Sequence, residues 1–204
     1  MKFYSYVIPR DFGFAPNPYF DYCTLATCKP GIRKSAQVGD LIGAFGSTHM
    51  MIRGKLVYLM LVDEILTFDE YWEDPRFQNK HPVFNKSVMH MYGDNIYHHL
   101  GDKWTQEPSH HSEVDGNINY INLNRDTKTN QVLIATEYYY FGNNAISLPQ
   151  EFESLIFKGR NYKICRDECL VERFIEYIRR NFEQGINGIP YSRKSGAFIH
   201  YGGK

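Results

Sequence analysis

The stretch that decides the fold is VGDLIGAFGS at residues 38–47, followed by KLVYLMLVDEIL at residues 55–66. Gly39-Asp40 marks a turn, and the apolar residues after it are typical of a strand that enters the core. The second stretch is continuously apolar and rich in β-branched residues, which favours a central strand. A turn near Arg53-Gly54 joins the two. We therefore expect adjacent buried strands at the centre of the protein.

Further elements are expected on both sides of this pair. The patterns KFYSYVI at Lys2–Ile8 and TNQVLIATEYYYFG at Thr129–Gly142 predict strands. A helix is indicated after residue 66, because Thr67 can act as its N-cap with Glu70 at the capping-box position. The most convincing amphipathic helix is CLVERFIEYIRRNFEQG at Cys169–Gly185, which its final glycine would cap.

Short strands, short helices and one longer helix near the C-terminus predict an α+β fold with a small β-barrel-like core. A length of 204 residues suits a single domain, which we place at residues 1–185. Residues 186–204 form a Gly- and Ser-rich basic tail. It is expected either to be partly disordered or to fold back as a lid.

Composition narrows the classes of function. The chain has 23 Lys+Arg and 23 Asp+Glu, so the formal net charge is zero, which disfavours a broad surface for duplex DNA. It contains no apolar run of membrane-spanning length and no secretory start, so a cytoplasmic location is expected. The cysteines at 23, 28, 165 and 169 are expected as free thiols without disulfides, and their spacing fits zinc poorly. The motifs of P-loop, dinucleotide-binding and serine-hydrolase proteins are missing from the sequence.

The segment YGDNIYHHLGDKWTQEPSHHSEVDG, residues 92–116, holds four of the eight histidines and reads as a loop-like functional site. Asp94 and His98 are four residues apart, so a helical turn would let the carboxylate orient the imidazole; alternatively, Asp94 caps a turn. His110 and His111 would face opposite ways in an extended backbone. A three-histidine metal site lacks a known spacing here, so acid/base or phosphate chemistry by one histidine is favoured and no metal is predicted.

The loop Arg10–Phe14, RDFGF, combines a guanidinium, a carboxylate and two rings, which suits phosphate contact and base stacking, although a surface ion pair over packed rings explains it equally. We expect it to line the cleft of the histidine-rich segment. The groups expected to do chemistry are Asp11, Asp94, His98, His110 and His111. The groups expected to bind the ligand are Arg10, Phe12, Phe14, Lys29, Arg33, Tyr97 and Trp104.

Several blocks occur in an order that resembles the nucleotide modification associated domain family of the second type. They are YSYVIPRDFGFAPNPYF, CTLATCKPGIRKSAQVGDLIGAFGS, KLVYLMLVDEILTFDEYWEDPRF, GDNIYH, SHHS and VLIATEYYYFG, within about Lys2–Pro149. The resemblance implies a nucleotide or nucleic-acid theme without defining a reaction. VGDLIGAFGS and the strand after it are also similar, at the level of fold, to the pseudouridine-synthase-associated barrels and modified-base readers. That similarity implies an aromatic pocket for a base, although fold does not determine function.

We therefore expect the protein to recognise a nucleotide or modified base, free or within nucleic acid, rather than a length of duplex. Whether it also modifies or hydrolyses that ligand is left open, as is any cofactor. The alternative is a non-catalytic interaction or regulatory subunit of a nucleic-acid modification or defence system.

Overall fold

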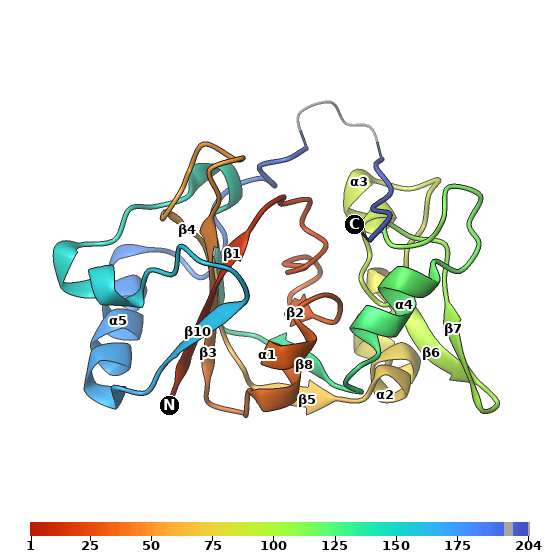
Figure 1. The fold of residues 1–204 in the computed structure, drawn as a ribbon, viewed down its shortest axis with the longest axis horizontal. Helices are drawn as coiled ribbons and strands as arrows, with labels where there is room; N and C mark the ends of the chain where they lie inside the picture. The colour runs from red at the N-terminus through yellow and green to blue at the C-terminus, as the bar shows by residue number, and fades with distance from the viewer. Residues whose placement is uncertain (194–197, 204) are drawn as a thin grey trace. The chain divides into compact units, whose positions relative to one another are not determined.

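The computed structural model describes residues 1–193 and 198–203 of a mixed α/β protein (Figure 1). Its contacts group these residues into two compact units. Unit 1 consists of residues 1–12, 36–63 and 135–193, and unit 2 of residues 13–35, 64–134 and 198–203. The single domain at residues 1–185 stays a prediction. Within the predicted tail, residues 194–197 and 204 lie outside the described residues.

Unit 1 is built on a six-stranded sheet with the order β10-β1-β3-β4-β9-β11. Its strands are β1 (Phe3–Ile8), β3 (Leu41–Gly46), β4 (Leu56–Leu61), β9 (Tyr138–Tyr140), β10 (Tyr162–Cys165) and β11 (Gly185–Ile186). β1 runs parallel to β3, and β3 runs antiparallel to β4. β1, β3 and β4 are buried almost throughout, because their apolar runs leave few polar positions to face water. The strands expected at Lys2–Ile8 and after Gly39-Asp40 are confirmed.

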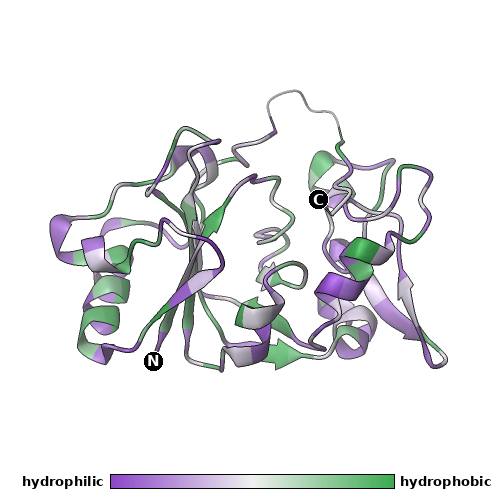
Figure 2. Ribbon diagram, viewed as in Figure 1, coloured by the Kyte–Doolittle hydropathy of each residue, from purple (hydrophilic) through white to green (hydrophobic). Residues whose placement is uncertain are grey.

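The long helix of unit 1 is α5 (Glu168–Asn181), which Asp167 caps at its N-terminus. Figure 2 shows both hydrophobic and hydrophilic residues along it. Its apolar side buries Phe174 in a core that also contains Phe3, and the two ring centroids lie 5.3 Å apart. Two short 3₁₀ helices, η2 (Gly142–Asn144) and η3 (Gln150–Leu155), complete the unit. The predicted helix is confirmed but ends earlier, because Gly185 belongs to β11 instead of capping the helix.

Unit 2 has smaller elements. Its strands are β2 (Cys23–Leu25), β5 (Glu64–Leu66), β6 (Tyr97–Leu100), β7 (Lys103–Gln106) and β8 (Val132–Ala135), the last ending at the unit boundary. Its helices are α1 (Pro30–Ser35), α2 (Phe68–Glu73), η1 (Pro75–Lys80), α3 (Val88–Met91) and α4 (Tyr120–Asp126). β2, β8 and β5 form one sheet, and β6 pairs with β7 in a hairpin. The capping box of Thr67 and Glu70 at the start of α2 is confirmed.

The barrel-like core is not confirmed, since no closed barrel is found among the described strands. The apolar run at residues 55–66, expected as one strand, is divided between β4 in the large sheet and β5, which pairs with β8. Asp63 interrupts the run and accepts hydrogen bonds from the backbone amide and hydroxyl of Thr136. The expected strand at Thr129–Gly142 likewise divides into β8 and β9. Each of the two expected strands is therefore divided between the six-stranded sheet and the three-stranded sheet.

The histidine-rich segment is not a plain loop, which corrects the sequence-based expectation. It contains the β6–β7 hairpin, whose turn passes through Gly101 at φ 62°, a conformation that suits glycine. Much of the segment is also buried, including Tyr97, His110 and His111. Buried polar groups need partners, and these partners define the site below. Within the described chain, no helix has both the length and the apolar character needed to cross a membrane.

Candidate functional site: the Cys28–His111–Asp126 cluster

Three chemically active side chains meet in unit 2. Cys28 lies in the turn between β2 and α1, His111 follows β7, and Asp126 is the last residue of α4. The Nε2 atom of His111 is 3.9 Å from the Sγ atom of Cys28, and its Nδ1 atom is 2.8 Å from Oδ2 of Asp126. His111 and Asp126 are buried, whereas Cys28 is partly exposed. The imidazole therefore lies between the thiol of a partly exposed cysteine and a buried carboxylate.

The carboxylate of Asp126 is held by several donors besides His111. Its Oδ1 atom accepts the backbone N–H of Cys28 at 3.0 Å and Nε of Arg125 at 2.9 Å. Its Oδ2 atom accepts the hydroxyl of Tyr97 at 3.0 Å. Both oxygens are thus occupied, and charge-assisted bonds of this kind are stronger than neutral ones. Tyr97 thus supports the carboxylate, and its expected contact with the ligand stays a prediction.

Arg33 anchors the backbone around the cluster. It is fully buried, and Nε, Nη1 and Nη2 donate to the carbonyls of Cys28, Gln131 and Asp126 respectively. Burial lowers the pKa of its guanidinium to about 10, with Asp126 opposing that shift. Its donors are directed at carbonyls, so the structure does not support the sequence-based expectation that Arg33 contacts phosphate. Lys29, expected in the same role, is partly buried beside Cys28.

The backbone at the thiol is strained. Cys28 and Lys29 have φ values of 58° and 41°, in the left-handed region that side chains with a Cβ rarely adopt. Each such residue costs roughly 1–2 kcal/mol. The hydrogen bond from the amide of Cys28 to Asp126 and the anchoring by Arg33 hold this conformation. Strain maintained by surrounding contacts is common at functional sites.

The charges of the cluster act on each other. Burial by itself would raise the pKa of the Cys28 thiol, but the charge and hydrogen bond of His111 outweigh burial and lower it. Burial would lower the pKa of His111, yet Asp126 and Cys28 raise it to about 9. Asp126 has a pKa below its usual range despite burial, because His111 and Arg125 stabilise the carboxylate. Together these shifts favour a thiolate paired with an imidazolium.

The same three residues have the ligand atoms of a metal site, and these atoms lie within 4.8 Å of one another. Both oxygens of Asp126 already accept hydrogen bonds, which leaves Sγ of Cys28 and Nε2 of His111. Two ligands are fewer than the three protein ligands of a catalytic zinc site. The guanidinium of Arg125, with Nη2 3.5 Å from Nδ1 of His111, adds positive charge that disfavours a cation. The arrangement suits proton transfer better than metal binding.

Aromatic groups flank the imidazoles. The ring of Phe14 lies 4.6 Å from that of His111 and 5.0 Å from that of His110. Tyr201 packs on the same two imidazoles, with its ring centroid 5.6 Å from that of His111 and 6.2 Å from that of His110. The guanidinium of Arg125 lies 5.6 Å from the centroid of the Tyr201 ring. Phe14, predicted from sequence to lie near the histidines, does so.

Asp94 does not orient His98. It is fully buried and accepts hydrogen bonds from the hydroxyls of Thr24 at 2.7 Å and Tyr71 at 2.8 Å. Burial raises its pKa, with Lys80 as the largest opposing charge. The four-residue spacing would align the two side chains on a helix, but His98 lies in strand β6, where that geometry does not apply.

His98 and Trp104 belong to the hairpin. Nε2 of His98 lies 3.0 Å from Glu107, and its ring stacks on Trp72 at 4.1 Å. Trp104 packs on His99 at 3.8 Å. In the described part of the chain, no hydrogen bond or ring contact joins Asp94, His98 and His111. Their convergence on one cleft stays a prediction without support from contacts.

The remaining predicted residues lie in unit 1. The carboxylate of Asp11 is buried and accepts the hydroxyl of Tyr140 at 2.6 Å and the backbone N–H of Tyr191 at 3.0 Å. Arg10 is exposed, and Phe12 is half-buried. These hydrogen bonds, and one from the amide of Asp11 to the hydroxyl of Ser192, attach residues 191–192 to the sheet of unit 1 and so have a structural role. The acid/base role of Asp11 stays a prediction.

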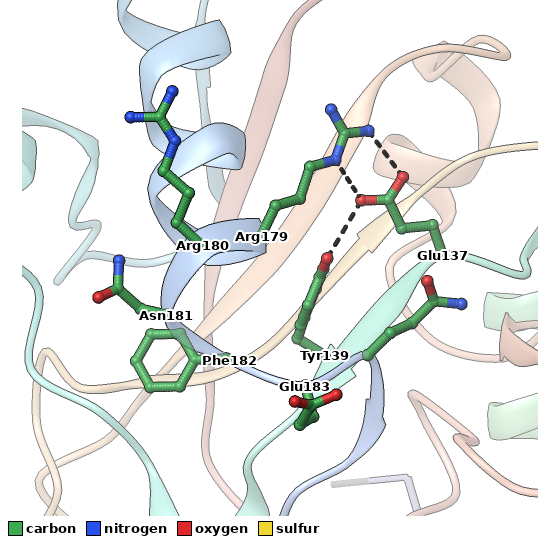
Figure 3. Close-up of a pocket in the computed structure, with 8 residues that line it drawn as sticks. Glu137, Tyr139, Arg179, Arg180, Asn181, Phe182 and Glu183 are labelled. Atoms are coloured by element: carbon green, nitrogen blue, oxygen red, sulfur yellow. Dashed lines mark hydrogen bonds and ion pairs between the residues drawn. The ribbon is translucent and has the colours of Figure 1, made fainter.

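A hollow of about 500 Å³ lies at the end of α5 in unit 1 (Figure 3). Arg179 points at Glu137 and makes two bonds of 2.7 Å with its carboxylate, which also accepts the hydroxyl of Tyr139. Most charged side chains that line the hollow are therefore paired. None of the site residues predicted from sequence lines it. The cluster in unit 2 is the stronger candidate.

Cys28, Asp126 and Arg125 were not among the site residues predicted from sequence. Cys28 was considered only as a free thiol or zinc ligand, and Asp126 lies in a polar stretch without a motif. The available signal was the combination of a cysteine with distant histidine and aspartate, which is informative only when the fold brings them together.

The model of nucleotide modification associated domain 2 matches residues 1–197, so the chain belongs to that family. The match extends beyond Pro149, where the resemblance of the sequence blocks ended. Membership indicates a role in nucleic-acid modification systems. No curated protein and no solved structure matches the chain.

Proposed function

We propose that the protein acts chemically on a nucleotide or modified base in a nucleic-acid modification system, with Cys28 as its nucleophile. The observation that carries this proposal is the Cys28–His111–Asp126 cluster. A nucleophile next to a base that is itself oriented by a third group is the general arrangement of covalent catalysis. His111 is the residue of the predicted chemical set that lies in this cluster.

The step follows from the charges of the cluster. The thiolate of Cys28 forms a bond to an electrophilic carbon of the base, and the double bond at that carbon opens. The electron pair it releases takes the proton held on Nε2 of His111, which leaves a neutral imidazole. Asp126 keeps the imidazole oriented through Nδ1 and stabilises its charged form. Reversal of the step returns the proton and releases the sulfur.

The nucleotide part of the proposal rests on the family and on the surroundings of the thiol. Lys29 and Arg125 supply positive charge for a phosphate, and the buried ring of Phe14 packs against the imidazoles. Zero net charge favours a mononucleotide or single base over a long duplex, because long-range attraction to a polyanion is weak. Stacking on a ring contributes roughly 1–3 kcal/mol per base.

The test is alkylation of Cys28 by iodoacetamide, read by peptide mass, with and without each 5′-mononucleotide and short single-stranded or duplex oligonucleotides. At least one nucleotide should slow the reaction at Cys28 but not at Cys169, the exposed thiol of unit 1. A covalent adduct should form in the wild type and in Cys169→Ser, but not in Cys28→Ser. Protection by duplex alone, with a steep dependence on salt, would contradict the pocket proposal.

The alternative of an interaction subunit is favoured by one observation. Tyr120 and Ile121, which are adjacent on α4, are 65% and 52% exposed. Exposed apolar side chains that gather in a patch often mark protein contacts. If no nucleotide or oligonucleotide protects Cys28 while Tyr120→Ser abolishes binding of a partner from the same modification system, this alternative replaces the enzymatic one.

A further inference from the structure

The last described residues of the chain pack on the candidate site. We call residues 198–203 the C-terminal segment, and the guanidinium of Arg125 with the imidazoles of His110 and His111 the His–Arg face. Both belong to unit 2, and Figure 1 shows the C-terminus beside α3 and α4. Tyr201 is the residue of the segment that contacts all three members of the His–Arg face.

The backbone of the segment is tied down on both sides of this contact. The amide of Tyr201 donates to the carbonyl of His110 at 2.7 Å, and its carbonyl accepts the side-chain amide of Asn122 at 2.6 Å. Two residues earlier, the amide of Ile199 donates to the hydroxyl of Tyr92 at 3.0 Å, and the carbonyl of Ile199 accepts a hydrogen bond from Nδ1 of His110. The position of the Tyr201 ring is thus set by hydrogen bonds that do not involve the ring itself.

The His–Arg face has the chemistry of a base-binding surface. Flat imidazoles next to a guanidinium stack on any aromatic ring, and a cation facing a ring gains about 0.5–1 kcal/mol at an exposed site. The same guanidinium can pair with a phosphate. In this structure an aromatic ring of the protein occupies that surface. Cys28, whose sulfur lies 3.9 Å from Nε2 of His111, is adjacent.

We propose that the His–Arg face is the seat of the nucleobase and that Tyr201 competes with the base for it. The C-terminal segment is then an intramolecular inhibitor, which a nucleotide displaces when it stacks on His111 with its phosphate near Arg125. This inference rests on the proposed function, because it assigns the base position next to the nucleophile. It adds a ligand class for that face and a regulatory role for the segment.

The experiment compares Tyr201→Gly, which removes the ring, with Tyr201→Phe, which keeps it, and with Tyr120→Ala as a control tyrosine elsewhere in unit 2. For each protein, alkylation of Cys28 by iodoacetamide and the affinities for the four 5′-ribonucleoside monophosphates are measured. Tyr201→Gly should react about fivefold faster and bind the preferred nucleotide about fivefold more tightly, which corresponds to a ring contact of about 1 kcal/mol. The other two variants should behave like the wild type.

Cys23 provides an internal control for folding, since it is fully buried in β2 of the same unit. If Cys23 reacts together with Cys28 in Tyr201→Gly, the variant has opened the whole unit, and Tyr201→Leu, which keeps an apolar side chain, decides instead. Equal nucleotide affinity and equal Cys28 reactivity in the ring-free variant and the wild type would overturn the competition. Weaker nucleotide binding without the ring would also overturn it, because Tyr201 would then stack on the base.

The two proposals fail in different ways. If a nucleotide protects Cys28 equally in the wild type and in Tyr201→Gly, the proposed function survives and the competition by Tyr201 is wrong. If no nucleotide protects Cys28 in any variant, the proposed function itself fails, and the base position on the His–Arg face falls with it.

Discussion

Units 1 and 2 have different interiors. Sixteen of the nineteen buried polar or charged residues in the described chain belong to unit 2, whereas a core cluster of thirteen buried apolar residues lies in unit 1. An apolar core is stabilised by removing surface from water. A polar interior depends on each group keeping its partners, because an unpaired buried charge is costly. Unit 1 is thus stabilised mainly by its apolar core. Unit 2 contains the Cys28–His111–Asp126 cluster, in which neighbouring charges shift the pKa values of the thiol and the imidazole.

The difference between the two interiors predicts that the largest loss of stability follows substitution of a buried carboxylate in unit 2. Asp126→Asn removes a charge that pairs with His111 and Arg125, so the free energy of unfolding should fall by about 3–5 kcal/mol. The control is Asp40→Asn in unit 1, where the carboxylate accepts the backbone amides of Lys2 and Gln37. That substitution should cost about 1–3 kcal/mol. Denaturant unfolding measures both. Equal losses would mean that the two interiors do not differ as described.

Acid should weaken the protein through the same residue. The pKa of Asp126 is lower in the folded state than in the unfolded chain, because His111 and Arg125 outweigh its burial. Its contribution is therefore present above the unfolded pKa of about 3.9 and is lost as pH falls through the folded value. Between pH 6 and pH 3 the wild type should lose about 1 kcal/mol more than Asp126→Asn, since the rest of the contribution is lost only below pH 3. Parallel curves for the two proteins would show that Asp126 is not the linked group.

A histidine comparison separates the buried pair from an exposed one. His111→Gln removes the charge that lowers the pKa of Cys28, so alkylation at pH 7 should slow by about tenfold and its pH midpoint should rise. His99→Gln breaks the partly exposed pair with Asp69 in the same unit and should leave Cys28 unchanged. Rates are read from the mass of the Cys28 peptide over a pH series. A midpoint that does not move in His111→Gln would remove the thiolate–imidazolium pair from the argument.

The smallest effect is expected at the hollow of unit 1. Arg179 is 45% exposed, so its pair with Glu137 is weakened by solvent and salt. Arg179→Ala should lower the free energy of unfolding by less than about 1 kcal/mol and leave nucleotide protection of Cys28 intact. A loss of protection in this variant would show that the hollow contributes to nucleotide binding, and the assignment of function to unit 2 alone would be wrong.

Sequence patterns were reliable where an element depends on its own residues. The capping box of Thr67 and Glu70 and the amphipathic face of α5 are local properties, and both were predicted. The predicted barrel was not confirmed, because periodicity describes a strand but not its pairing partner. The division of the run at residues 55–66 depends on the contact of Asp63 with Thr136, which lies 73 residues away.

For the candidate site, the sequence by itself determined the family, the density of histidines before residue 116, and the proximity of Phe14 to two of them. Only the tertiary structure decided which histidine has a nucleophile on one side and a carboxylate on the other. Cys28 and Asp126 are 98 residues apart, and neither has a neighbouring motif. Their chemistry arises from burial and from each other's charge, which are properties of positions in space and cannot be read along the chain.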